Sequence, residues 1–160
     1  MDRKPLLDKC RAIEENALYT AQAHFEEAKR QALWNRWLVI GPSVLSFGAG
    51  AAVALGAPKP LGVLALVGGL IAGLAGALDV SQGVYRHNQA GNAFTALRHD
   101  AEALRVTFAQ MKTDGELIAA VELLHDRYAT LTASTDVTSQ TAFETARARI
   151  RQGVFRSDGT

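Results

Sequence analysis

The sequence predicts an all-α protein: a two-span transmembrane helical hairpin with a cytoplasmic helical bundle or coiled coil formed by both flanks. Two observations support this fold class. Two apolar runs, residues 38–57 and 61–78, lie close together in the middle of the 160-residue chain, and the expected spans cover about 38–57 and 61–80. In the polar flanks, apolar residues recur at spacings of three and four, which is the period of an amphipathic helix. We therefore expect an N-terminal cytoplasmic helix over 1–36, a transmembrane hairpin over 37–84, and C-terminal cytoplasmic helices with a tail over 85–160.

The central runs are long enough to cross a lipid bilayer. Between Leu38 and Leu78 the only charged residue is Lys59. A run of roughly 18 apolar residues, at about 1.5 Å per residue, is enough to cross a hydrocarbon layer of about 30 Å. Pro58 and Pro60 flank Lys59, and the turn should fall there because proline inside a helix removes a hydrogen bond. The alternative is a hairpin buried in a soluble core, but soluble domains of this size rarely contain two such uncharged runs.

Basic and aromatic residues predict the orientation of the hairpin. The turn has Lys59 alone, whereas several basic residues lie outside the two runs: Lys29, Arg30, Arg36, Arg86 and Arg98. Basic residues are enriched on the cytoplasmic side of membranes, so both termini should be cytoplasmic. Trp34, Trp37 and Tyr85 would then form an aromatic belt at the same interface. The long leading segment of mixed charge argues against a secretory signal peptide.

The flanks contain several helical patterns. The first covers residues 6–36, with apolar positions at Leu6, Cys10, Ile13, Ala17, Ala21, Phe25, Ala28 and Ala32. A heptad seam follows the hairpin, made of Phe94, Leu97, Ala101, Leu104, Phe108 and Met111. After a break at residues 113–115, a second seam consists of Leu117, Val121, Leu124, Tyr128 and Leu131. Residues 132–141 predict a loop. The last helix, residues 142–155, should carry Phe143, Ala146, Ile150 and Val154 on one side.

Small residues recur at every fourth position in both apolar runs. Candidates for close packing are Gly48 and Gly56 in the first run and Gly69 and Gly73 in the second. Lipid gives helices little hydrophobic drive to associate, so close contact between backbones matters. In one interpretation these residues only pack the two spans of one chain together. Because the glycines cover more than one helix face, we also expect a homo-oligomer, and a tetramer is among the arrangements that the sequence allows.

Three polar residues are candidates for lining a pore. Asp79 follows the second run of uncharged residues, and in an oligomer its copies would form a ring of carboxylates that attracts cations. In the alternative, Asp79 lies just beyond the hydrocarbon and is exposed to headgroups and water. Ser43 and Ser46 could line the pore as well, or could hydrogen-bond back to their own helix.

Nothing in the sequence predicts an enzyme, a cofactor or a metal site. The four histidines are scattered without metal-ligand spacing, no glycine-rich phosphate loop follows a strand, and the carboxylates are expected on solvated helix faces. Arginine is suited to binding phosphate bidentately, and the candidates are Arg98, Arg105, Arg147, Arg149 and Arg151. These arginines could bind a nucleotide or short nucleic acid, lie on a solvated face, or attract anionic lipid.

Residues 17–55 resemble the start of the SLATT family of two-span membrane proteins. The similarity lies in Tyr19, Ala23, Ala28, Lys29, Arg30, Trp34, Trp37 and the Gly-Pro-Ser sequence at 41–43. The resemblance implies an effector of bacterial antiviral defence that oligomerises, permeabilises the inner membrane and so kills or arrests the infected cell. It also implies control by a signal from a partner enzyme, a nucleotidyltransferase or a reverse transcriptase.

Two functions are therefore expected from the sequence. The first is an oligomeric inner-membrane ion channel or pore, gated by a nucleotide or oligonucleotide that binds the cytoplasmic helices. The alternative is a membrane-anchored scaffold that recruits a protein partner through its coiled-coil faces. A soluble helical bundle is a third interpretation, and it requires the two apolar runs to be buried.

Overall fold

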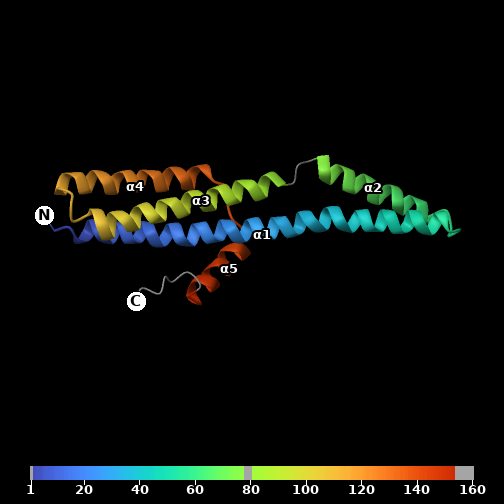
Figure 1. The fold of residues 1–160 in the computed structure, drawn as a ribbon, viewed down its shortest axis with the longest axis horizontal. Helices are drawn as coiled ribbons and strands as arrows, with labels where there is room; N and C mark the ends of the chain where they lie inside the picture. Colours follow the sequence, from blue (N-terminus) through green and yellow to red (C-terminus); the bar gives the residue numbers. More distant parts are fainter. Residues whose placement is uncertain (1, 78–80, 154–160) are drawn as a thin grey trace. The chain divides into compact units, whose positions relative to one another are not determined.

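The computed structural model describes residues 2–77 and 81–153 and contains only helices and their connections over these residues (Figure 1). The elements are α1 (Lys4–Ala54), α2 (Leu61–Ala77), α3 (Ser81–Ala103), the π-helical turn η1 (Leu104–Phe108), α4 (Asp114–Ser134) and α5 (Gln140–Arg151). The all-α prediction is confirmed. The chain divides into two compact units: a bundle unit, residues up to 28 and from 86 onward, and an apolar unit, residues 29–85.

The helix expected over residues 6–36 runs straight on into the first apolar run, because α1 is one helix of 51 residues that contains Pro42. Its C-terminus is set by Gly56, whose φ of 97° is a left-handed conformation that favours glycine. The amides of Gly56 and Ala57 donate to the carbonyls of Val53 and Ala52, which is a Schellman motif. The helix therefore ends three residues before the predicted end of the first span.

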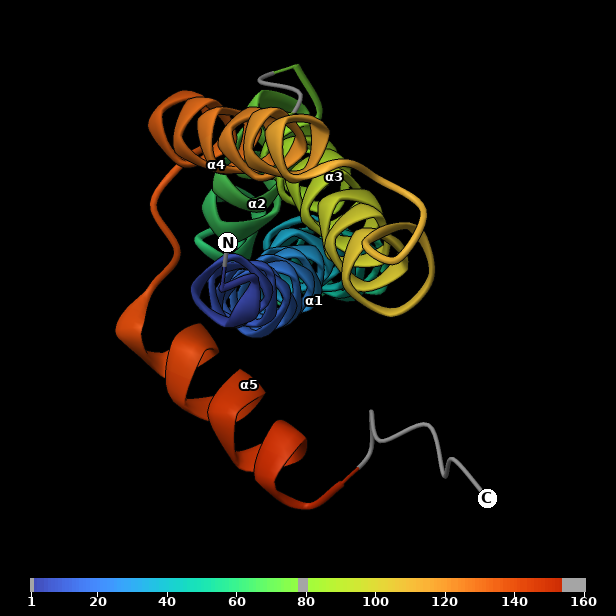
Figure 2. The same ribbon diagram turned by 90° about the vertical axis from the view of Figure 1, so that its left-hand side faces the viewer.

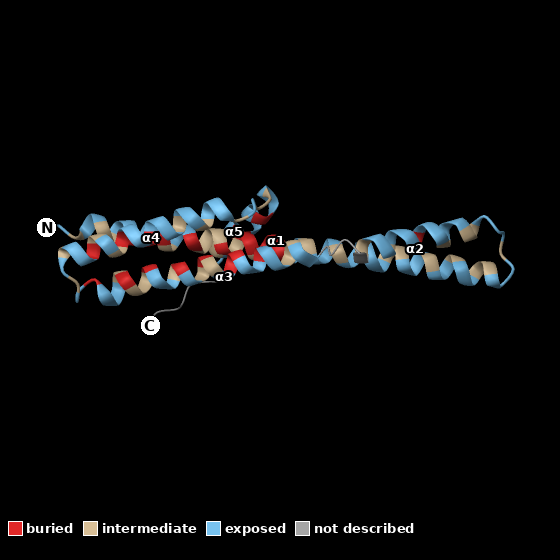
Figure 3. Cartoon of the chain, turned by 90° about the horizontal axis from the view of Figure 1, so that it is seen from above, coloured by how far each residue is buried: buried red, intermediate tan, exposed pale blue. Residues whose placement is uncertain are grey.

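Both flanks form one bundle, as the sequence predicts. Buried residues gather on the first half of α1, on α3 and on α4 (Figure 3). The larger core cluster consists of Cys10, Ile13, Leu97, Ala101, Leu104, Ala109, Leu117, Val121 and Leu124. The smaller cluster consists of Ala17, Ala21 and Phe94. Figure 2 shows α3 and α4 on one side of α1, whereas α5 lies on another side.

The predicted heptad seam after the hairpin is correct as far as Leu104 and wrong beyond it. The amide of Ala109 donates to the carbonyl of Leu104, five residues back, at 2.8 Å. This π-helical turn holds one residue more than an α-helical turn, so it shifts the buried face by one position. Ala109 is buried, whereas Phe108 and Met111 are 48% and 77% exposed.

Arg3, near the start of the chain, binds the connection between η1 and α4. The Arg3 guanidinium donates to the carbonyls of Ala109 and Lys112 and to the Asp114 carboxylate at 3.0, 3.0 and 2.7 Å. The carbonyls that follow a helix end need such partners. The hydrogen bond from Arg3 also lowers the pKa of the Asp114 carboxyl. Helix α4 then begins with a capping box between Thr113 and Glu116.

The second seam is confirmed, because Leu117, Val121 and Leu124 are buried and Tyr128 and Leu131 pack against the core. The predicted loop is shorter than expected, since α4 continues to Ser134. Ser139 then caps α5 by accepting from the amide of Ala142. The buried residues of α5 are Ala142 and Ala146, whereas Phe143 is 43% exposed. Val154 lies outside the described residues.

The expected pair of membrane spans is found only in part. Among residues 2–77 and 81–153, α1 is the one helix long and apolar enough to cross a membrane, and only 6% of its apolar segment is buried. Helix α2 is strongly apolar but is described over only 17 residues. The rest of the second predicted span, residues 78–80, lies outside the described residues.

Candidate functional site

The two helices of the apolar unit meet closely at one place. The Ser46 hydroxyl of α1 donates to the Ala65 carbonyl of α2 at 2.6 Å. One turn further along α2, Gly68 is buried, and a Cβ atom added to it would lie 2.7 Å from the Pro42 carbonyl oxygen. Only a residue without a side chain fits this contact between backbones. Gly68 is therefore the packing glycine of the unit, although the sequence pattern points to other glycines.

The four glycines predicted to pack the spans have different surroundings. Gly69 lies beside the Ser46 hydroxyl, and Gly56 forms the left-handed end of α1. Gly48 and Gly73 have open space where a Cβ would stand. A shallow groove of about 650 Å³ runs along α2 and is lined by Gly62, Ala65, Leu66, Gly69, Leu70, Gly73 and Leu74. Much of the small-residue face of α2 thus stays uncovered within the described part of one chain.

The pore candidates have defined partners where the structure describes them. Ser43 donates to the Val39 carbonyl of its own helix at 2.7 Å. Ser46 donates across to α2, so neither hydroxyl proton points to open space. Asp79 lies outside the described residues.

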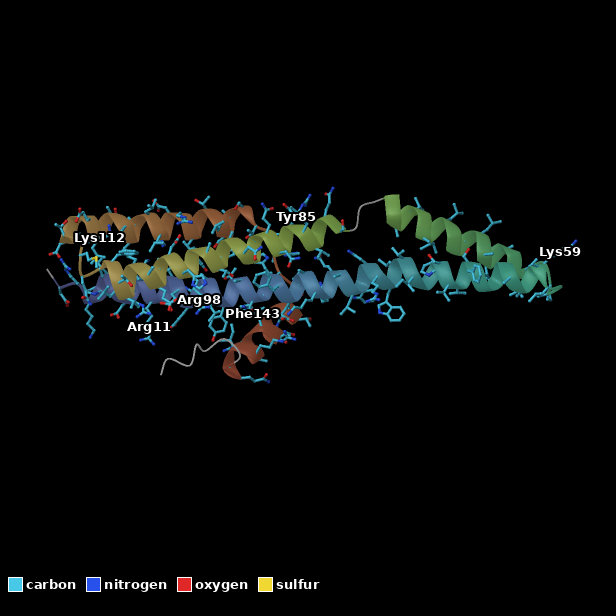
Figure 4. The ribbon with its side chains drawn as sticks, in the orientation of Figure 1. Arg11, Lys59, Tyr85, Arg98, Lys112 and Phe143 are labelled. Atoms are coloured by element: carbon cyan, nitrogen blue, oxygen red, sulfur yellow. The ribbon has the colours of Figure 1, made fainter. Side chains whose placement is uncertain are left out.

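The predicted aromatic belt is exposed. Trp34, Trp37 and Tyr85 are 62%, 66% and 69% accessible. A Cβ added to Gly83 would collide with the side chain of Gln31, so the start of α3 lies against α1 one turn before Trp34. Tyr85 and Lys59 are at opposite ends of the apolar unit (Figure 4).

The five candidate arginines are not brought together. Arg98 and Arg105 lie on α3 and η1, whereas the other three lie on α5, on another side of α1 (Figure 2). Arg105 forms an ion pair with Glu14 at 3.0 Å, and Arg149 forms one with Glu26 at 2.7 Å. The Nε atom of Arg98 is buried without a hydrogen-bond partner among the described residues. Arg147 and Arg151 are exposed.

Two carboxylates are buried, which corrects the expectation that the acids lie on solvated faces. Glu26 and Glu27 of α1 are 8% and 3% exposed. Glu26 pairs with Arg149, and Glu27 accepts from the hydroxyl and the amide of Ser139 at 2.5 and 3.3 Å. A buried carboxylate is costly unless it has such partners. The partners lie more than 110 positions away in the chain, so local spacing gives no sign of them.

Two histidines that look scattered in the sequence meet inside the bundle. The Nδ1 atoms of His24 and His87 are 3.0 Å apart, and both rings are almost fully buried. His24 also stacks on Phe94, with ring centroids 5.8 Å apart. Burial lowers the pKa of His24, and the nearby His87 lowers it further. No group of three or more metal-ligating side chains occurs in the described ranges.

We expect the bundle unit to lose stability in mild acid because of this pair. Protons bind the unfolded His24 below pH about 6.5, whereas the folded residue resists protonation. Stability is therefore complete above that pH and falls as the pH drops toward the lowered folded pKa, by at most about 1.4 kcal/mol per pH unit for one proton. The Glu27 and Asp136 carboxylates act in the opposite direction on His24 but less strongly than burial. Thermal unfolding between pH 5 and 8 measures the slope.

A matched pair of variants isolates the contribution of His24. His24→Gln should flatten the slope, because glutamine does not titrate. His125→Gln removes an exposed histidine and should leave the slope as it is. A wild-type slope of opposite sign, or equal slopes in wild type and His24→Gln, would contradict the assignment.

Comparison of the chain with models of protein families, with curated proteins and with solved structures gives no match. The resemblance to the SLATT family therefore rests on the residues quoted above, which lie on α1. The structural features that bear on function are the exposed apolar surface of residues 29–85 and the charged contacts of the bundle.

Proposed function

We propose that the protein is an oligomeric membrane channel or pore whose opening is controlled by a nucleotide or oligonucleotide that binds the bundle unit. One observation carries the membrane assignment: the large apolar side chains of the apolar unit point outward. They include Leu38, Val44, Leu45 and Phe47 on α1 and Val63, Leu66, Leu70 and Leu74 on α2. Water disfavours such a surface, whereas lipid tails solvate it.

The proposed membrane arrangement is a hairpin with two spans, formed by residues 38–57 and 61–80. The contact of Ser46 and Gly68 with the facing helix supports antiparallel packing of these segments. Trp34, Trp37 and Tyr85 are exposed, and Tyr85 lies at the end of the apolar unit opposite Lys59. An exposed aromatic belt at that end supports a cytoplasmic position for both termini. In a bacterium the membrane would be the inner membrane.

The proposed oligomer forms through the uncovered face of α2. Its groove holds Gly62, Ala65, Gly69 and Gly73, and stripes of this kind let helices approach closely in lipid. A ring of hairpins would surround a path for ions and bring the copies of Asp79 together, where their charge would favour cations. Gating is then a shift between closed and open states by a signal that binds one of them better.

The biological setting follows from the resemblance to the SLATT family. We propose an effector of anti-phage defence that causes abortive infection. A partner nucleotidyltransferase would supply the signal. The arginines of the bundle, above all those of α5, provide the positive charge that would receive phosphate groups.

Ion flux through liposomes tests the proposal. Purified protein in liposomes should pass cations, and short oligonucleotides or nucleotides should change the flux. Asp79→Asn should lower the permeability of cations relative to anions. Glu144→Gln, which removes an exposed carboxylate of α5, should not change that ratio. Correctly oligomeric protein that passes no ions under any condition would refute the channel.

A membrane-anchored scaffold is the second candidate, and exposed apolar side chains in η1 and just after it favour this function. Val106, Phe108 and Met111 are exposed there, and for Phe108 and Met111 the cause is the π-helical turn, which rotates them out of the core. Such side chains could hold a protein partner. In this case the liposomes would pass no ions and Asp79→Asn would have no effect. Phe108→Ser combined with Met111→Ser would abolish recruitment of the protein partner.

A further inference from the structure

Helix α5 is attached to the bundle by few apolar contacts. Neither hydrophobic core cluster contains a residue of α5. The buried residues of α5 among those described are two alanines, Ala142 and Ala146, whose small side chains bury little apolar area. Phe143, the largest apolar side chain of the helix, is 43% exposed and is labelled in Figure 4. Hydrophobic burial therefore contributes little to holding α5 in place.

Polar contacts to two adjacent residues of α1 hold α5 instead. Arg149, near the C-terminal end of α5, pairs with Glu26 at 2.7 Å. Ser139, the N-cap of α5, donates twice to Glu27. Both ends of the helix are thus tied to the same turn of α1, directly before Lys29. Elements held mainly by polar contacts, with little apolar burial, are those that open locally at low cost.

The charges of α5 give a physical means to open it. Glu144 is its only acid, against Arg147, Arg149 and Arg151. Arg147 and Arg151 lie four positions apart on one face, while Arg149 is turned away from them toward Glu26. A phosphate chain that engages Arg149 has to compete with the Glu26 carboxylate for the same guanidinium. Such a ligand binds the released helix better than the attached one.

We propose that α5 is a releasable strap and that a short single-stranded oligonucleotide releases it. Phosphate groups replace Glu26 at Arg149 and also bind Arg147 and Arg151. The ligand therefore shifts the protein population toward the state in which α5 is released. Release uncovers Glu26 and Glu27 on α1. This inference rests on the proposed function, because it takes the signal to be a nucleic acid or nucleotide. It adds that the signal binds α5 and that it displaces the Glu26 carboxylate from Arg149.

Hydrogen–deuterium exchange of residues 140–151 tests the strap, with full-length protein in a non-ionic detergent and a six-nucleotide oligothymidylate as the probe. Without probe, Glu26→Gln should speed exchange in α5 about tenfold or more, because the partly buried, charged hydrogen bond to Arg149 is lost. Glu144→Gln is the matched control: it adds the same charge to the protein without touching an attachment. It should leave the exchange of α5 unchanged.

The probe separates this inference from the proposed function. If the inference holds, the probe speeds exchange in wild-type α5 and binds Glu26→Gln several-fold more tightly than wild type, since attachment no longer competes. Two results would refute the release of α5 but leave the proposed nucleic-acid signal intact. In the first, the probe binds and α5 stays protected; in the second, Glu144→Gln tightens binding as much as Glu26→Gln. If the probe binds none of these proteins, the proposed nucleic-acid signal fails, and release by it fails too.

Discussion

Replacing Phe94 with alanine should destabilise the bundle unit by about 3–5 kcal/mol, the usual cost of deleting a buried aromatic ring. Phe94 is fully buried in the cluster with Ala17 and Ala21. Its ring stacks on His24 and meets the edge of Tyr128 at 6.0 Å between centroids. The neighbouring alanines are too small to fill the space left behind. Urea unfolding followed by far-ultraviolet circular dichroism measures the loss.

Phe108→Ala is the matched control, because the heptad pattern gives both phenylalanines the same place in the seam. Phe108 is 48% exposed, so its removal should cost less than about 1 kcal/mol. The contrast between the two variants tests the π-helical turn directly. Similar losses in both would show that the seam continues through Phe108, contrary to the structure.

Replacing Gly68 with leucine should separate the two helices of the apolar unit and cost at least about 1–3 kcal/mol, the range for overpacked cores. Even the first carbon of the new side chain would lie 2.7 Å from the Pro42 carbonyl oxygen. That oxygen belongs to the backbone, so it can move only if the helix moves. The hydrogen bond from Ser46 to Ala65 should break as well. Both tryptophans lie in this unit, and their fluorescence during thermal unfolding in detergent reports on it.

Gly73→Leu makes the same change where the chain has open space. The unfolding temperature of the monomeric hairpin should stay the same. If the groove on α2 is the subunit interface that we propose, this variant should dissociate the oligomer in size-exclusion chromatography. A Gly68→Leu protein as stable as Gly73→Leu would refute the close contact at Gly68.

The helical class, the bundle formed by both flanks and most of its core were predictable from periodicity. Leu97, Leu117 and Leu124 occupy core positions because each stands on the apolar face of a regular helix. Phe108 was not predictable in this way. A π-helical turn leaves no mark on a pattern of threes and fours, since the pattern continues in the sequence while the backbone rotates.

The polar contacts of the bundle could not be predicted because they join residues far apart in the chain. His24 meets His87, and Glu26 meets Arg149, across 63 and 123 positions. Spacing rules detect partners within one helix, whereas these contacts depend on which helices pack together. Glu27 and Ser139 show the same limit: serine before a helix suggests a cap, but not that a carboxylate from α1 holds it.

The glycines show how similar residues acquire different tasks. The every-fourth-residue pattern predicts Gly48, Gly56, Gly69 and Gly73 as packing positions, yet the closest contact is made by Gly68, one position out of the stripe. The reason is Pro42, whose carbonyl faces α2 at this level. Which glycine meets it depends on how the two helices are rotated about their own axes, and composition does not determine that rotation.

The π-helical turn at Leu104–Phe108 also has a consequence for how the chain tolerates changes of length. Such a turn is a helix that has absorbed one inserted residue without breaking. A chain shortened by one residue here could form a plain α-helix, with Leu104 kept in place and the residue now called Ala109 still in the core cluster. A relative with a one-residue gap at this point could therefore share the same core. An insertion within α3 that no further π-helical turn absorbs would displace Phe94 or Leu97 from the core.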